Sequence, residues 1–180
     1  MADGDYAFDP SDGQLADVAR SGAREWERDM AVWEADAEQL RLRQRAMVDV
    51  LWEAMQRGDA VTVTLGEHSF TGALTVARGD LAILETQDVT LAINVEAIDL
   101  VQFAAGGQGV AGDRTYGSLR AYAGMLEVEG VPVRLLGDHI DVTGRVVVVA
   151  EDHVLIEDPR GASHAVAWSA TRAFVRSLSP

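Results

Sequence analysis

Residues 61–74 read VTVTLGEHSFTGAL, and this stretch decides how the rest of the chain is interpreted. Val61, Val63 and Leu65 alternate with threonines, which is the period of a strand with one buried face. The Gly66-Glu-His sequence then predicts a tight turn, and a second run of the same period follows it. The stretch therefore predicts an antiparallel hairpin at the start of a strand-rich module.

Further short apolar segments separated by turn residues continue toward the carboxyl end. They predict three more strands, at 81–84, 89–95 and 98–103. Five short strands that follow a helix are typical of a small, strongly bent barrel. We therefore expect a first small β-barrel over residues 58–103.

The same pattern returns later in the chain. Gly66-Glu67-His68 matches Gly137-Asp138-His139, Thr71-Gly72 matches Thr143-Gly144, and Gly79-Asp80 with Ile83-Leu84-Glu85 matches Glu151-Asp152 with Leu155-Ile156-Glu157. Matching turns at matching spacing indicate an internal repeat. We predict a Gly-rich linker over 104–117, then a short helix and a second five-stranded barrel over 118–178.

The region before the first module is predicted to be a long amphipathic helix over 14–57, preceded by a disordered acidic tail over 1–13. The apolar stripe of this helix consists of Trp26, Met30, Trp33, Ala37 and Leu40, and Met47, Leu51 and Ala54 extend it after Gln44. One interpretation is that the stripe covers the barrels. The other is that it binds a protein partner, either a second copy or a foreign helix, through Trp26, Met30, Trp33 and Leu40.

These elements predict the fold class α+β, mainly β with helices: a long N-terminal helix followed by two tandem small barrels. A barrel of this size buries little surface on its own. We therefore expect the long helix and both barrels to form one body.

Composition excludes several classes of function. The net charge of −14 disfavours bulk nucleic-acid binding, which depends on neutralising phosphates with basic side chains. The chain has no cysteine, so disulfides, thiol nucleophiles and thiolate metal sites are excluded. No apolar run is long enough for a membrane helix and no signal-peptide pattern is present, so we expect a cytoplasmic protein.

The hairpin 61–74 resembles the opening of Sm-like proteins, a superfamily of SH3-like small β-barrels, in which a glycine within the second strand lets that strand bend. Gly72 and Gly144 match this glycine. The whole arrangement also resembles a group of uncharacterised actinobacterial proteins that have an N-terminal helix and tandem small barrels. The nucleotide pocket of RNA-binding Sm-like proteins has an Asp-x-x-x-Asn stretch and a later Arg-Gly pair. This chain has Arg78-Gly79-Asp80-Leu81-Ala82 and Ala92-Ile93-Asn94-Val95-Glu96 at those places, so it lacks that pattern.

We find no catalytic constellation, no cofactor motif and no metal-ligand spacing in the sequence. His68 and His139 occupy equivalent turns beside acidic residues, and they would form a metal or pH-sensing site only if the two turns met. His153 and His164 would face each other across two strands. Glu85 and Glu157 end equivalent strands, so a paired acidic rim is a further alternative.

Three hypotheses for function follow. The first is a non-enzymatic scaffold or regulatory protein that binds a protein partner, with a homo-oligomer through the long helix or a barrel edge as one form. The second is a diverged Sm-like regulator that binds single-stranded RNA through the less acidic second module, where the candidate RNA or anion contacts are Arg134, Arg145, Arg160, Arg172, Arg176 and Trp168. For Trp168 the alternative is a place in the core. The third is a metal-dependent enzyme.

Overall fold

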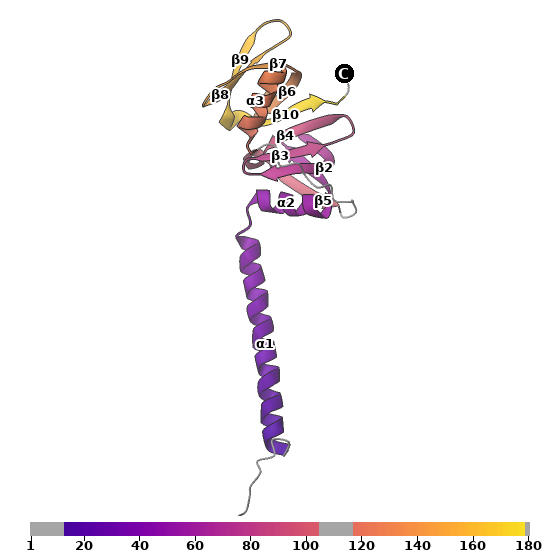
Figure 1. Ribbon diagram of the computed structural model, residues 1–180, viewed down its shortest axis with the longest axis vertical. Coiled ribbons are helices and arrows are strands. Elements are labelled where there is room, and N and C mark those ends of the chain that lie inside the picture. Colours follow the sequence, from indigo (N-terminus) through magenta and orange to yellow (C-terminus); the bar gives the residue numbers. More distant parts are fainter. Residues whose placement is uncertain (1–12, 105–116, 179–180) are drawn as a thin grey trace, which may run out of the picture. The chain divides into compact units, whose positions relative to one another are not determined.

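The computed structural model describes residues 13–104 and 117–178, with side chains from Arg20 onward (Figure 1). The chain divides into two compact units, residues 1–45 and 46–180. Helix α1 (Gly13–Arg43) belongs to the first unit, and the second unit holds every strand in the described ranges. The expectation of a single body is therefore wrong for α1. The predicted tail over 1–13 and linker over 104–117 lie almost entirely outside the described residues.

The second unit contains two similar series of elements, each with a helix followed by five strands. The first series is α2 (Met47–Arg57), β1 (Ala60–Leu65), β2 (His68–Arg78), β3 (Leu81–Glu85), β4 (Val89–Asn94), the short helix η1 (Val95–Ala97) and β5 (Leu100–Ala104). The second is α3 (Leu119–Glu129), β6 (Pro132–Gly137), β7 (Ile140–Val149), β8 (His153–Glu157), β9 (Ser163–Ala167), η2 (Trp168–Ala170) and β10 (Thr171–Ser177). The element order of the sequence prediction is thus confirmed.

The strands pair differently from the expected two barrels. They form one ten-stranded antiparallel sheet with the order β5-β1-β2-β3-β4-β10-β6-β7-β8-β9. Closure of the first half would require β4 to pair with β5, but β4 pairs with β10 and β5 lies at the end of the sheet. The fold class is therefore α+β, with an open sheet that is not closed into a barrel.

Burial explains why β4 pairs with β10. Ala92 and Ile93 on β4 lie opposite Phe174 and Ala173 on β10, and all four are fully buried. Strands that are apolar on both faces lose the most contact with water when both of their edges are also paired. Strand β5 is mostly exposed and gains less from an inner place in the sheet.

Two hydrophobic cores lie on opposite faces of the central strands. Leu91 and Ile93 point into a core that includes α2, whereas Ala92 between them points into a core that includes α3. Helix α2 packs on β2 and α3 packs on β7. Because both cores use residues of β4 and β10, the two halves of the sheet share their hydrophobic interior.

The predicted single helix over 14–57 is interrupted at residues 44–46. Ala46 has an extended backbone with ψ 157° and serves as the N-cap of α2, and the Asp49 carboxylate accepts its backbone N–H at 3.1 Å. Helix α2 ends at Arg57, where the sequence predicts the end of the helix, and Gly58, with φ 70°, is its C-cap. No helix in the described ranges has both the length and the apolar character that a membrane-spanning segment requires.

Gly72 and Gly144 lie where a strand crosses very close to its neighbour. A Cβ atom on Gly72 would stand 2.8 Å from the carbonyl carbon of Glu85, and one on Gly144 would stand 2.6 Å from Ile156 Cγ2. The pairing register shifts a few residues further along both strands, between Leu74 and Val76 in β2 and between Val146 and Val148 in β7. Such bulges bend a strand.

The two hairpin turns correspond with an offset of one residue from the sequence alignment. Leu65 pairs with His68 and Gly137 pairs with Ile140, so the two-residue turns are Gly66-Glu67 and Asp138-His139. Gly66 has φ 60° and His139 has φ 57°. His139 is therefore a turn residue, whereas His68 is the first residue of β2.

Candidate binding surfaces

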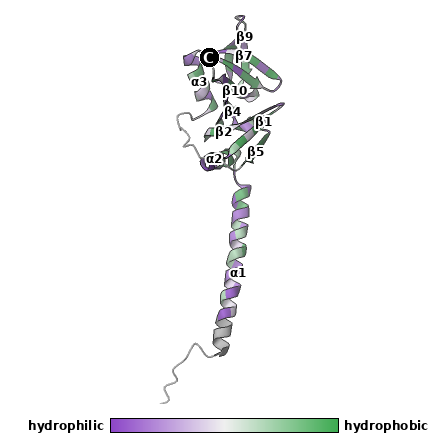
Figure 2. Cartoon of the chain, turned by 90° about the vertical axis from the view of Figure 1, so that its right-hand side faces the viewer, coloured by the Kyte–Doolittle hydropathy of each residue, from purple (hydrophilic) through white to green (hydrophobic). Residues whose placement is uncertain are grey.

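The apolar stripe of α1 is exposed along its whole described length. The exposed fractions are 68% for Trp26, 41% for Met30, 74% for Trp33 and 57% for Leu40. Figure 2 shows hydrophobic residues interleaved with hydrophilic ones along this helix. No described side chain of α1 belongs to either core, and α2 is the helix that covers the first core. The interpretation of the stripe as cover for the sheet is thus confirmed for Leu51 and Ala54 of α2.

Three of the five candidate arginines are neutralised by carboxylates. Arg134 forms a bidentate pair with Asp141, with Nε to Oδ1 at 2.7 Å and an η-nitrogen to Oδ2 at 2.5 Å. The hydrogen bond from Arg134 is the largest cause that lowers the pKa of Asp141. Arg176 pairs with Glu129 at 2.7 Å, and Arg172 pairs with two aspartates. A phosphate would have to compete with a carboxylate at each of these positions.

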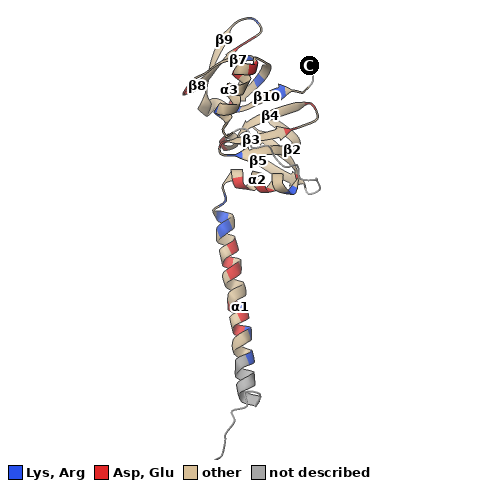
Figure 3. Ribbon diagram, viewed as in Figure 1, with Lys and Arg blue, Asp and Glu red and all other residues tan. Residues whose placement is uncertain are grey.

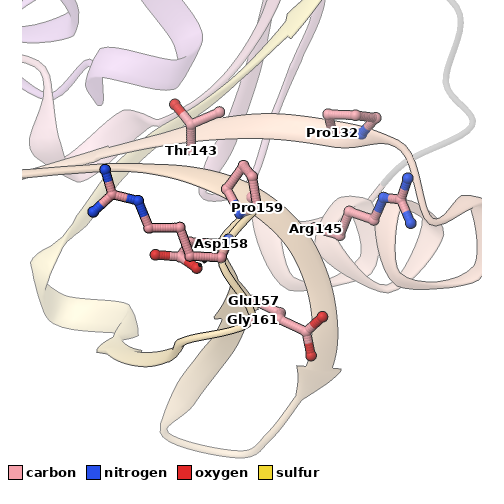
Figure 4. A pocket seen from close by; sticks show the side chains of 9 residues that line it. Pro132, Thr143, Arg145, Glu157, Asp158, Pro159 and Gly161 are labelled. Carbon is pink, nitrogen blue, oxygen red and sulfur yellow. Dashed lines mark hydrogen bonds between the residues drawn. The ribbon is translucent and has the colours of Figure 1, made fainter.

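Arg145 and Arg160 differ from these three. Neither forms an ion pair with a described side chain, and both line one cavity of about 620 Å³. Its other lining residues are Pro132, Thr143, Gly144, Glu157, Asp158, Pro159 and Gly161. Figure 4 shows Arg145 on β7 and Glu157 at the end of β8 beside this cavity. These two arginines are the part of the predicted set that the structure brings together.

The loop that carries Arg160 is held by Asp158. The Asp158 carboxylate accepts the backbone N–H of Arg160 at 2.8 Å and that of Ala162 at 2.9 Å. The pKa of Asp158 is lowered, first by the bond from Ala162. The backbone around Arg160 is therefore fixed while its guanidinium has no carboxylate partner among the described side chains.

Trp168 packs against the second core. Its indole N–H donates to the Ala150 carbonyl at 3.2 Å, and its ring meets the Phe174 ring edge-on at a centroid distance of 6.5 Å. Trp168 is a partly buried member of that core. Its place fits the core interpretation of this residue better than a stacking platform for a base.

His153 and His164 do not face each other across strands β8 and β9. His153 pairs in register with Ala167, and His164 pairs with Ile156. Each ring instead contacts an aspartate of its own loop, Asp152 at 2.5 Å and Asp158 at 3.5 Å. The interpretation of a histidine pair across two strands is therefore wrong.

Glu85 and Glu157 end equivalent strands in the two halves of the sheet. Glu85 lies between Ala73 and Thr90 in the register, and Glu157 lies between Arg145 and Ser163. The strand pairing thus provides no paired acidic rim.

The two hairpin turns do meet, as the sequence analysis required for a site that contains both His68 and His139. They line one cavity of about 390 Å³, together with Arg172. The described residues include no group of three or more histidine or acidic side chains placed to hold a metal ion. The two turns therefore form a contact between the halves of the sheet, and Arg172 is the residue that makes it.

Arg172 joins the two halves of the sheet at this cavity. From β10 it donates to the Asp138 carboxylate in the second half, and it reaches the Ala97 carbonyl at 3.0 Å and the Asp99 carboxylate at 2.7 Å in the first half. Asp99 also accepts the backbone N–H of Gly66 at 2.5 Å. Sequence reasoning missed these contacts because Asp99 and Arg172 are 73 positions apart.

The pKa of Asp99 is lowered, first by the Gly66 N–H and then by Arg172. A carboxyl with a lowered pKa in the folded state stabilises the fold above its ordinary pKa of about 3.9, and this contribution is lost as the pH falls through the folded-state value. We expect Asp99→Asn to be less stable than the unmodified chain at neutral pH. We also expect its free energy of unfolding to decline less on acidification below about pH 4.

Urea unfolding at a series of pH values, followed by circular dichroism, measures this difference. Asp88→Asn changes an exposed aspartate in the turn between β3 and β4 and serves as the control. Parallel pH profiles for Asp99→Asn and the unmodified chain would contradict the role of Asp99.

No protein-family model matches this chain, and no curated protein is significantly similar to it.

Proposed function

We propose that this protein is a non-enzymatic scaffold or regulatory protein that binds a protein partner through the exposed stripe of α1. The observation that supports this proposal most directly is the exposure of Trp26, Met30, Trp33 and Leu40 on one helix. Exposed apolar patches of this kind mark interaction sites, and tryptophan is among the residues that contribute most to binding. An amphipathic helix that presents anchors at these spacings suits a helical partner or a hydrophobic groove.

A second candidate function is that of a diverged Sm-like regulator that binds single-stranded RNA. The cavity flanked by Arg145 and Arg160 favours it, because two guanidinium groups without described carboxylate partners suit an anionic ligand. The proposal includes the finer fold assignment, in which each half of the sheet is a copy of one open Sm-like barrel with its bend near Gly72 or Gly144. The net charge of −14 opposes this candidate.

One experiment separates the two candidates. The tagged chain is used to capture partners from its native cell, with and without nuclease treatment, beside the double variants Trp26→Ala/Trp33→Ala and Arg145→Ala/Arg160→Ala. We expect specific protein partners that survive the nuclease and are lost with the tryptophan variant. Both tryptophans lie in the unit 1–45, so their replacement spares the cores of the sheet.

Arg134→Ala provides the matched control for the arginine variant, because Arg134 is already neutralised by Asp141. Salt-sensitive capture of RNA that is lost with Arg145→Ala/Arg160→Ala and kept with Arg134→Ala would favour the second candidate. Capture that is the same with and without the two tryptophans would overturn the first.

A further inference from the structure

The stripe of α1 has the repeat of a two-stranded coiled coil. Ala23, Trp26, Met30, Trp33, Ala37 and Leu40 follow at alternating spacings of three and four residues, and every described side chain from residue 20 to residue 44 is exposed. Most of the stability of a helix in a protein comes from packing its apolar face. A helix of 31 residues with this face uncovered therefore lacks the contact that normally stabilises it.

We propose that the partner of α1 is a second copy of α1, paired antiparallel about a two-fold axis level with Ala35. This inference rests on the proposed function and names its partner. In this register Trp33 faces Ala37 of the second copy, and Met30 faces Leu40 of the second copy. The Trp33 indole thus packs on a methyl group, and Trp26 faces Gln44 of the second copy. A parallel pair would place Trp33 against Trp33 and Trp26 against Trp26, which is bulky for a narrow seam.

The charges beside the stripe support the antiparallel pair. In this register Glu27 faces Arg41 of the second copy and Asp29 faces Arg43 of the second copy, and the symmetry repeats both contacts. Figure 3 shows acidic residues in the middle of α1 and basic residues toward its carboxyl end. The like pairs of this arrangement are Glu34 with its own copy and Asp36 with its own copy, and both lie beside the axis.

Two other arrangements have poorer charge contacts. In a parallel pair Asp29 faces Glu34 of the second copy, and this repulsion offsets the attraction between Asp36 and Arg41. An antiparallel pair moved by one heptad toward the amino end places Glu27 against Glu34 and Asp29 against Asp36. Like charges at these flanking positions destabilise such pairs. An antiparallel pair moved by one heptad toward the carboxyl end keeps opposite charges, but it places Trp33 against Gln44 and leaves Trp26 and Met30 beyond the end of the partner helix. Charge complementarity thus selects the direction, and the overlap of the two stripes selects the register.

Arg41 and Arg43 are available for contacts with a second copy, since the described ion pairs of these two side chains include only one weak pair within α1. Arg41 approaches Glu38 at 4.0 Å, and its side chain is 73% exposed. An exposed pair of this kind contributes little stability, so forming a contact with Glu27 of a second copy does not require a strong contact to be broken.

Sedimentation equilibrium of the full chain tests the proposal. We expect an associating species of twice the chain mass of 19.3 kDa, and we expect Trp33→Glu to remain a monomer. Asp29→Arg distinguishes the two directions: it places like charges together in the antiparallel pair and is expected to weaken association at least tenfold, whereas it would strengthen a parallel pair. Arg28→Glu, on the side of the helix opposite the stripe, is the control and is expected to change association little.

A mixing experiment then tests the register. Glu27→Arg/Asp29→Arg and Arg41→Glu/Arg43→Glu are each expected to be monomeric alone and to associate with one another when mixed, because only the mixture restores opposite charges at all four contacts. A monomer at every concentration, or stronger association of Asp29→Arg, would overturn the proposal. A monomeric chain that still captured a foreign protein through Trp26 and Trp33 would leave the proposed function standing with a different partner.

Discussion

Gly144→Ala is expected to lower the free energy of unfolding by about 3 kcal/mol or more, because the added methyl group has no room. A Cβ atom at this position would overlap the carbonyl oxygen of Glu157 and stand 2.6 Å from Ile156 Cγ2. The first of these is a backbone atom of the paired strand β8, so β7 and β8 would have to separate. Urea unfolding followed by circular dichroism measures the loss.

Gly124→Ala is the matched control for this substitution. Gly124 lies within α3, and a Cβ atom there would meet nothing within 4 Å. Alanine is favoured over glycine in a helix interior, so this variant is expected to be unchanged or more stable by about 0.5–1 kcal/mol. Gly72→Ala is expected to behave like Gly144→Ala, since its Cβ atom would overlap the carbonyl oxygen of Glu85. A stable Gly144→Ala chain would show that the two strands are less tightly apposed than described.

Phe174→Ala is expected to cost about 3–5 kcal/mol and to destabilise both halves of the sheet together. Phe174 is fully buried in the second core, and its strand β10 pairs with β4 of the first half. Because both cores use residues of these two strands, the first core cannot stay intact once β10 leaves the sheet. If Phe174→Ala fails to fold, Phe174→Leu reports the same effect at a smaller cost.

Two variants of the chain, each with a single tryptophan, report the urea unfolding of the two halves of the sheet separately. One keeps Trp52 on α2 and the other keeps Trp168 in the second core. We expect their urea transitions to coincide, and we expect Phe174→Ala to shift both by the same amount. Val128→Ala, which changes a side chain that is 88% exposed on α3, is the control and is expected to stay within about 0.5 kcal/mol. A first half that kept its midpoint in Phe174→Ala would show that the halves fold independently.

The candidate surfaces were only partly predictable from the sequence. The heptad spacing identified the stripe of α1, because helical periodicity is a local property. The sequence identified the candidate arginines, but it could not show which of them form ion pairs with carboxylates. Arg134 is neutralised from the same hairpin, by Asp141, whereas Arg176 is neutralised by Glu129, which is 47 positions away. Only the fold shows that Arg145 and Arg160 differ from the rest.

The sequence alone determined the elements of this protein: the strands, the turns at Gly66 and His139, and the two glycines at which strands approach closely. These features depend on residues that are near one another along the chain, so alternation and turn chemistry reveal them. Tertiary structure decided how the elements combine. The contact between β4 and β10 joins residues about eighty positions apart, and it forms because burying two doubly apolar strands outweighs closing each half on itself. That single pairing replaces two expected barrels by one open sheet with two cores.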